Sequence, residues 1–173
     1  MHAAEVALVD LTEQQRDAFI DQQVVDYAEQ QVRDAGWSPD EALPRAVREF
    51  RSVIEQELLQ ARIDGHCLWT ATNGDGAAVG WLWVRPPLDD MPSDSVFIEQ
   101  ITVKDEFRRQ GYGLAMAEAL EVELARGGTL TICLHVFSEN TPALRLYERA
   151  GYTIVTRHPQ TLRLCKVLVL PPG

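Results

Sequence analysis

The chain has 173 residues, enough for one hydrophobic core and few for two, because domains usually run to about 100–150 residues. Hydrophobic residues make up 46% and charged residues 24%, a globular balance that excludes a disordered or fibrous chain. The net charge of −10 excludes non-specific nucleic-acid binding, which needs a basic surface. No apolar run approaches the ~20 residues that span a bilayer, and the start lacks a secretory signal, so we expect a cytoplasmic protein.

A strand and a helix are expected first. The strand is predicted over residues 5–11. Thr12 and Gln15 then have the spacing of a capping box, and apolar residues recur at helical intervals until Gly36 ends the helix.

A second helix is expected from Ser38, whose hydroxyl would be the N-cap, with Pro39 at the first helical position. Its apolar stripe runs on over residues 46–61, which predicts one continuous helix. Pro44 removes an amide near the start and predicts a kink there or a later beginning.

The remainder is expected to be mostly strands. The predicted strands are 66–72, 77–85, 95–103, 129–136, 152–155 and 162–170, and the predicted helices are 111–126 and 141–150. The turn 73–76, Asn-Gly-Asp-Gly, predicts a hairpin between the first two of these strands. The element order β-α-α-β-β-β-α-β-α-β-β indicates an α+β (mixed α/β) fold in one domain.

Three cysteines, Cys67, Cys133 and Cys165, are far apart and match no zinc spacing, so no metal site is expected. Each lies in an apolar, strand-like stretch. Free cysteines are usually buried, so we expect small buried side chains in a reducing compartment.

The segment 108–114 is a glycine-bearing turn between a predicted strand and a predicted helix. The first amides of a helix have no internal partner and carry the positive end of its dipole. Gly111 and Gly113 let the chain bend so that these amides face an anion, and Arg108 or Arg109 adds charge. The turn predicts a pyrophosphate cradle, although two such glycines also fit a simple tight turn.

Two motifs, in this order, resemble the GNAT superfamily of N-acetyltransferases. Arg108-x-x-Gly111-x-Gly113 after an apolar strand is similar to its acetyl-CoA-binding signature. Residues 140–152, with Asn, Ala, Leu-Tyr and Gly-aromatic at matching intervals, resemble its later signature. Together the motifs cover residues 97–155.

The resemblance implies a single domain over residues 1–173, with a mixed, largely antiparallel sheet that splays between its fourth and fifth strands and is flanked by helices. It implies a helical, substrate-facing arm at about residues 12–62 and a CoA-binding core at about 95–156. Acetyl-CoA is the implied co-substrate, with its pantetheine arm in the splay, and no metal is implied.

The resemblance also assigns residues to the cofactor. Backbone groups of Ile101 and Val103 would meet the pantetheine, and Asn140 would bond the pantetheine or the helix start. The full implied set is Ile101, Thr102, Val103, Arg108, Arg109, Gln110, Gly111, Tyr112, Gly113, Leu114, Asn140, Ala143 and Tyr147.

The resemblance makes Tyr147 the general acid for the CoA thiolate, as in many members; an aromatic side chain packed in the core is the alternative. Glu99, on the strand that carries Ile101, is the first candidate for the base. His135 is the second, because imidazole titrates near neutrality. A chain of waters is the third.

The expected acceptor is a primary amine of a small molecule or peptide, attacking directly in a ternary complex. The acidic composition favours a basic acceptor, which Asp89 and Asp90 could meet. Neither nucleic acid nor a membrane is an expected partner, and the apolar tail 164–170 could supply an edge strand for a homodimer. Two alternatives stay open: a non-catalytic acyl-CoA-binding regulatory module on the same fold, and an unrelated structural domain.

Overall fold

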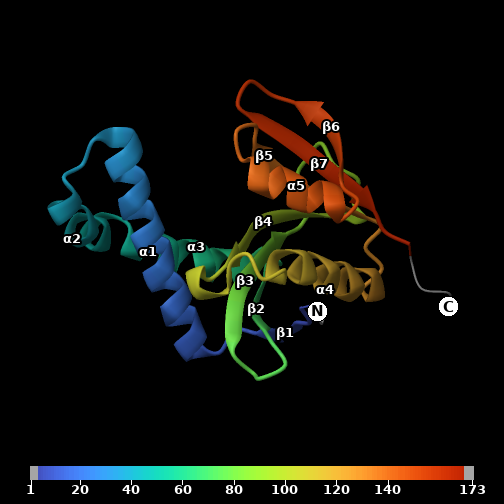
Figure 1. The fold of residues 1–173 in the computed structure, drawn as a ribbon, viewed down its shortest axis with the longest axis horizontal. Coiled ribbons are helices and arrows are strands. Elements are labelled where there is room, and N and C mark those ends of the chain that lie inside the picture. Colours follow the sequence, from blue (N-terminus) through green and yellow to red (C-terminus); the bar gives the residue numbers. More distant parts are fainter. Residues whose placement is uncertain (1–3, 170–173) are drawn as a thin grey trace. The chain divides into compact units, whose positions relative to one another are not determined.

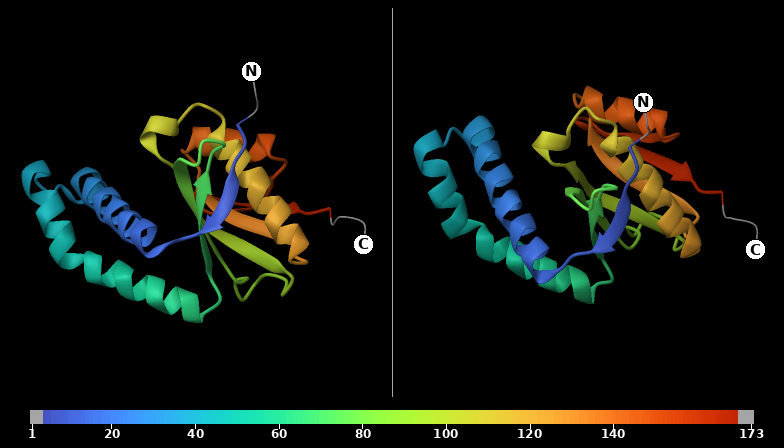
Figure 2. Two further views of the ribbon diagram at one scale, coloured as in Figure 1. Left: turned by 90° about the horizontal axis from the view of Figure 1, so that it is seen from below. Right: turned by 60° about the horizontal axis from the view of Figure 1, so that its bottom comes forward.

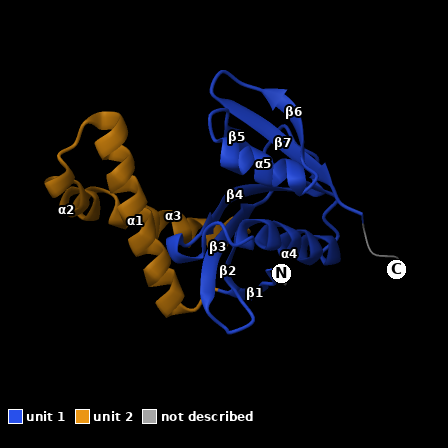
Figure 3. Cartoon of the chain, in the orientation of Figure 1, with its two compact units in different colours: residues 1–10, 66–173 blue, residues 11–65 orange. Residues whose placement is uncertain are grey.

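The computed structural model describes residues 4–169. The chain divides into two compact units (Figure 3): residues 11–65 form a helical unit, and the described parts of 1–10 and 66–173 form a sheet unit. The helical unit has nearly the bounds of the predicted arm, whose role stays a prediction. None of the helices in the described part of the chain has the length and apolar character needed to cross a membrane.

The helical unit contains α1 (Glu13–Ala35), α2 (Pro39–Glu49) and α3 (Arg51–Ile63). The predicted capping box at the start of α1 is confirmed. The Thr12 hydroxyl accepts a hydrogen bond from the amide of Gln15, and the Gln15 side chain accepts one from the amide of Thr12. Both bonds satisfy amides that the helix itself leaves unpaired.

The predicted second helix is two helices, interrupted at Phe50, where φ is −114°. The Phe50 ring stacks on Tyr27 of α1, with ring centroids 4.3 Å apart, and this packing accompanies the break. Pro44 lies inside α2 without ending it. Ser38 is the N-cap residue and Pro39 begins the helix, both as predicted, but the Ser38 hydroxyl makes no capping bond, so that part of the prediction is wrong.

The sheet unit contains seven strands and two main helices. Their bounds are β1 (Ala7–Asp10), β2 (Cys67–Thr72), β3 (Ala78–Arg85), β4 (Ser95–Val103), α4 (Tyr112–Arg126), β5 (Thr131–Phe137), α5 (Thr141–Arg149), β6 (Thr153–Arg157) and β7 (Thr161–Val167). The strands form one sheet in the order β1-β2-β3-β4-β5-β7-β6 (Figure 1). Among the strand pairs of residues 4–169, only β4 with β5 is parallel, which confirms the predicted mixed, largely antiparallel sheet.

α4 and α5 pack on one face of this sheet and enclose its core with it. Alternate side chains of the central strands point to that face. The largest fully buried side chains in this core, from the strands and from α4, are Leu82, Met116, Leu120, Ile132, Leu134 and Leu164. Burying each stabilises the fold by about 1.5–3 kcal/mol relative to exposure. At the edge of the sheet, β1 lies beside α4 (Figure 2).

Two predictions about the C-terminal strands are wrong. Residues 164–167 do not form a sheet edge, because β7 lies between β5 and β6; Leu170 lies outside the described residues. Cys133 and Cys165 are not free thiols: they face each other across β5 and β7, with Cα atoms 4.1 Å apart, and form a disulfide. Cys67 is exposed rather than buried.

The sheet approaches α4 closely at Gly80 of β3. A Cβ atom at this position would lie 2.1 Å from the carbonyl oxygen of Thr102 and 3.0 Å from the terminal methyl of Met116. Backbone on β4 cannot retreat without breaking the sheet pairing. Gly80 is therefore required by packing.

Replacing Gly80 with Ala is expected to lower the free energy of unfolding by about 3 kcal/mol, because the added methyl overpacks the β3–β4 contact. Urea unfolding measures the change. Gly74→Ala is the matched control, since nothing lies within 4 Å of its Cβ position. Equal stability of the two variants would contradict this packing.

Candidate active site

β4 and β5 are paired over only part of their length. Residues Ser95–Ile98 pair in parallel with Thr131–Leu134, and β4 then continues to Val103 without β5 beside it. The sheet therefore opens between its fourth and fifth strands, as predicted.

A β-bulge in β4 lies where the two strands separate. Trp83 of β3 pairs with Gln100, whereas the next residue, Val84, pairs with Ile98. Glu99 is thus an extra residue on β4 with no partner across the pair. A bulge bends its strand and interrupts the ladder, so this single residue accounts for the departure of β4 from β5.

A cavity of about 200 Å³ lies in the opening between β4 and β5. Glu99 and Ile101 line it from β4, and Asn140, Ala143 and Tyr147 line it from the start and middle of α5. The remaining lining residues are Ile98, Gln100, Leu134, His135, Val136 and Phe137. The cavity therefore brings together predicted site residues from two distant parts of the chain, residues 99–101 and residues 140–147.

The backbone of β4 turns two of its residues toward the opening. Lys104 donates its N–H to the carbonyl of Val79 on β3, and backbone groups alternate sides along a strand. Thr102 therefore faces β3, and Ile101 and Val103 face the open side. The prediction for Ile101 and Val103 has a structural basis, whereas the backbone of Thr102 is directed into the sheet.

Six consecutive amides, from Arg109 to Leu114, donate no hydrogen bond within the described residues, while the flanking amides of Arg108 and Ala115 are both paired. Backbone φ is +62° at Arg109 and +89° at Gly111. Left-handed residues alternating with right-handed ones turn successive N–H groups into a concave anion site. The positive end of the α4 dipole lies at the same point.

The two arginines of this turn have different surroundings. Arg108 donates its Nε–H to the carbonyl of Val103 at 3.2 Å and pairs with Asp105 at 2.8 Å, so its guanidinium ties the turn to the end of β4. Arg109 makes no hydrogen bond or ion pair within the described residues. Arg109 is therefore the arginine of this turn whose charge is available to an anion.

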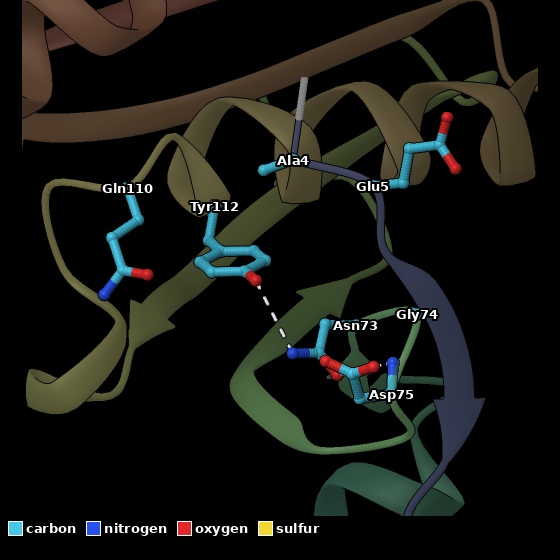
Figure 4. A pocket seen from close by; sticks show the side chains of 7 residues that line it. All are labelled: Ala4, Glu5, Asn73, Gly74, Asp75, Gln110 and Tyr112. Atoms are coloured by element: carbon cyan, nitrogen blue, oxygen red, sulfur yellow. Dashed lines mark hydrogen bonds between the residues drawn. The ribbon is translucent and has the colours of Figure 1, made fainter. Parts of the chain in front are cut away.

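The side chains of Gln110 and Tyr112 lie on another side of the turn (Figure 4). They line a cavity of about 360 Å³ that shares no lining residue with the opening between β4 and β5. The Asn73 amide points to the Tyr112 hydroxyl at 3.5 Å, and the acidic residues Glu5 and Asp75 are among those that line the same cavity. Negative charge there disfavours phosphate, so Gln110 and Tyr112 can serve a diphosphate only through their backbone.

Asn140 caps α5: its side-chain oxygen accepts a hydrogen bond from the amide of Ala143 at 3.2 Å. This bond fixes the start of α5, the helix that also carries Tyr147. Tyr147 is only 8% exposed and packs edge-on against Tyr152. Burial raises the pKa of Tyr147 to about 12, so its hydroxyl stays protonated, and able to donate, throughout the physiological range.

A polar cluster occupies the sheet face opposite α4 and α5, at the same opening. Arg85 pairs with Glu99 at 3.2 Å. Arg163 donates its Nε–H to Nε2 of His135 at 3.1 Å and pairs with Asp90 at 2.6 Å. The expectation that Asp90 is free for a cationic acceptor is therefore wrong, because Arg163 already neutralises it.

His135 is held in its neutral form. Burial lowers the pKa of His135, the positive charge of Arg163 and the neighbouring His158 lower it further, and Asp90 and Glu99 oppose them. Because Nε2 accepts from Arg163, the imidazole proton is on Nδ1. The lone pair that a base would use is occupied, which leaves Glu99 as the stronger candidate.

Arg85 and Arg163 were not predicted as site residues. Arg85 ends the run Trp81-Leu82-Trp83-Val84-Arg85, and period-two alternation could have placed it on the face of the two tryptophans. The partners of both arginines lie on neighbouring strands, however, so their roles depend on the strand register, which cannot be read from the sequence.

The solved structures that resemble this one define the class of fold. They include the PaiA N-acetyltransferase of Thermoplasma acidophilum in complex with coenzyme A, with a TM-score of 0.67, 12% identity and coverage of 94% of this chain and 99% of that one. The spermidine N-acetyltransferase of Vibrio cholerae, in complex with CoA and spermine, gives a TM-score of 0.66, 16% identity and coverage of 94% and 95%.

Sequence comparison identifies the family. The model of the Acetyltransferase (GNAT) family matches residues 22–152, and the chain belongs to this family. It is 28% identical over 148 residues to the protein named "Uncharacterized N-acetyltransferase YdgE" of Bacillus subtilis (strain 168), covering 85% of this chain and 91% of that protein. The resemblance seen in the two sequence motifs is thereby confirmed.

The neutral state of His135 can be tested by titrating its imidazole by NMR. Its pKa is expected below the ordinary 6.5 and should rise in Arg163→Met, which removes a donor and a repelling charge. Because the folded pKa lies below the unfolded one, this group lowers the free energy of unfolding only as the pH falls below about 6.5.

Arg157→Met, which removes the same charge from exposed β6, is the control and should leave the titration unchanged. A His135 pKa above 6.5, or one that does not change in Arg163→Met, would contradict the neutral state assigned to His135.

Proposed function

We propose that the protein is an N-acetyltransferase that moves an acetyl group from acetyl-CoA to a primary amine by direct attack, with both substrates bound. The observation that carries this proposal is the row of six unpaired amides at Arg109–Leu114, next to an open edge of β4. Membership of the GNAT family supports acyl transfer. The nature of the acyl donor is part of the proposal.

The residues of the turn and strand fit coenzyme A. The amides of 109–114 would hold the diphosphate, with Arg109 beside them. The outward-facing groups of Ile101 and Val103 would pair with the amides of the pantetheine as an added strand would. When bound, acetyl-CoA supplies an activated thioester. No metal is part of the proposal.

Proton balance sets the duties of the side chains. The amine loses a proton as its nitrogen bonds to the acetyl carbon, and the sulfur gains one as the carbon–sulfur bond breaks. Tyr147, protonated and in the cavity wall, is the proposed donor to sulfur. Glu99, which pairs with Arg85, is the proposed acceptor of the amine proton, directly or through water.

The acceptor is proposed to be a primary amine of a small molecule or peptide. The fold neighbour from Vibrio cholerae is a spermidine N-acetyltransferase, which illustrates a small-molecule acceptor on this fold. A non-catalytic regulatory module has no specific observation in its favour, because the cavity contains both a proton donor and a carboxylate. The cytoplasm remains the proposed compartment.

Cofactor binding is tested by thermal unfolding with acetyl-CoA, longer acyl-CoAs and NAD. A ligand at 100 times its dissociation constant stabilises the native state by about 2.7 kcal/mol, so acyl-CoAs should raise the melting temperature and NAD should not. Equal shifts in melting temperature for acyl-CoAs and NAD, or no shift with either, would contradict the proposed binding of coenzyme A.

Tyr147→Phe is expected to lower kcat about 100-fold or more, the scale of general acid catalysis, while acetyl-CoA binding stays unchanged. Thiol release measures kcat and calorimetry measures binding. Tyr152→Phe is the matched control, since it removes another buried tyrosine hydroxyl that does not line the cavity. Full activity of Tyr147→Phe across the pH range would exclude Tyr147 as the acid.

A further inference from the structure

The face of the sheet opposite α4 and α5 carries side chains at the splayed end that the proposed chemistry only partly uses. The strand register places Arg85, Phe97 and Cys133 in one row across β3, β4 and β5. His135 and Arg163 form the next row across β5 and β7. Phe97 packs edge-on against His135 and separates the two arginines.

Arg163 is committed to the protein. Its side chain is only 15% exposed, its Nε–H bonds to His135, and its terminal nitrogen pairs with Asp90 at 2.6 Å. Its charge is therefore compensated, and this half of the face adds no net charge to the opening.

Arg85 is only partly satisfied. One terminal nitrogen bonds to one oxygen of Glu99 at 3.2 Å, and its buried Nε has no hydrogen-bond partner among the described residues. A guanidinium presents five donors in a planar fork that suits a carboxylate. Because Nε is buried, a ligand oxygen can use only the terminal nitrogens, and the second of these donates no hydrogen bond within the described residues.

Glu99 is also incompletely satisfied. The contact with Arg85 uses Oε1, and no second hydrogen bond to this carboxylate exists within residues 4–169. Its side chain is 34% exposed and that of Arg85 is 38% exposed, so both groups can be reached by a small molecule. Glu99 lines the cavity and Arg85 is in direct contact with it, so a negative and a positive group, each with unused hydrogen-bonding capacity, lie side by side there.

We propose, building on the function proposed above, that the acceptor is a small α-amino acid, with its ammonium group on Glu99 and its carboxylate on Arg85. An α-amino acid carries both charges on one carbon, and the Arg85–Glu99 contact presents the complementary charges at matching close range. A polyamine would meet the guanidinium as a like charge, and an amine without a carboxylate would leave its free terminal nitrogen unpaired.

The test measures thiol release at saturating acetyl-CoA. The acceptors are the twenty standard L-amino acids, their carboxamides, putrescine and spermidine. For at least one free amino acid, kcat/KM should be at least tenfold higher than for its carboxamide. Arg85→Met should abolish that preference by raising KM for the free amino acid more than for its carboxamide, while acetyl-CoA binding stays unchanged. Arg157→Met, at an exposed arginine on β6, should keep the preference.

Carboxamides or polyamines that react as well as free amino acids would overturn the proposal, as would an Arg85→Met variant that slows every acceptor equally. Calorimetry of amino acids with the CoA-loaded protein gives a second readout that does not need turnover. Binding that is lost in Arg85→Met supports the proposal, and no binding of any amino acid overturns it. Failure to bind acetyl-CoA, or CoA binding without thiol release from any amine, contradicts the acetyltransferase function instead.

Discussion

The geometry of this site depends on one extra residue in β4. Glu99 interrupts the pairing of β4 with β3, and the parallel pairing with β5 ends one residue before it, at Ile98. Backbone groups beyond that point, at Ile101 and Val103, then lack a strand neighbour. Buried backbone polar groups need partners, so the opening must be filled by water or by a ligand that can act as a strand.

The turn before α4 supplies the second half of the proposed binding surface. A residue other than glycine at φ +62°, Arg109, costs on the order of 1 kcal/mol, and it lies at the six unpaired amides of the proposed anion site. The start of α4 is also fixed against α5: a Cβ on Gly113 would lie 2.5 Å from the side chain of Leu146. The amides and Tyr147 therefore belong to one tightly packed pair of helices.

Local sequence patterns predicted most of the secondary structure, whereas the features that were missed depend on tertiary contacts. Caps, glycine turns and period-two alternation predicted all seven strands and both main helices of the sheet unit, but not the short 3-10 helix Asp105–Phe107, and the glycine turn predicted the amides of the candidate site. The break at Phe50 depends on packing between helices, and the bulge at Glu99 and the disulfide of Cys133 with Cys165 depend on strand register. Arg85 was missed for the same reason, because its partner lies on another strand.

Amide hydrogen exchange with and without CoA tests the central claim most directly, because it reports on the backbone donors themselves. If the turn holds the diphosphate and β4 pairs with the pantetheine, CoA will slow exchange at Arg109–Leu114 and at Ile101 and Val103, and much less at Thr102, which already faces β3. Tight binding of CoA with unchanged exchange at these amides would contradict the account.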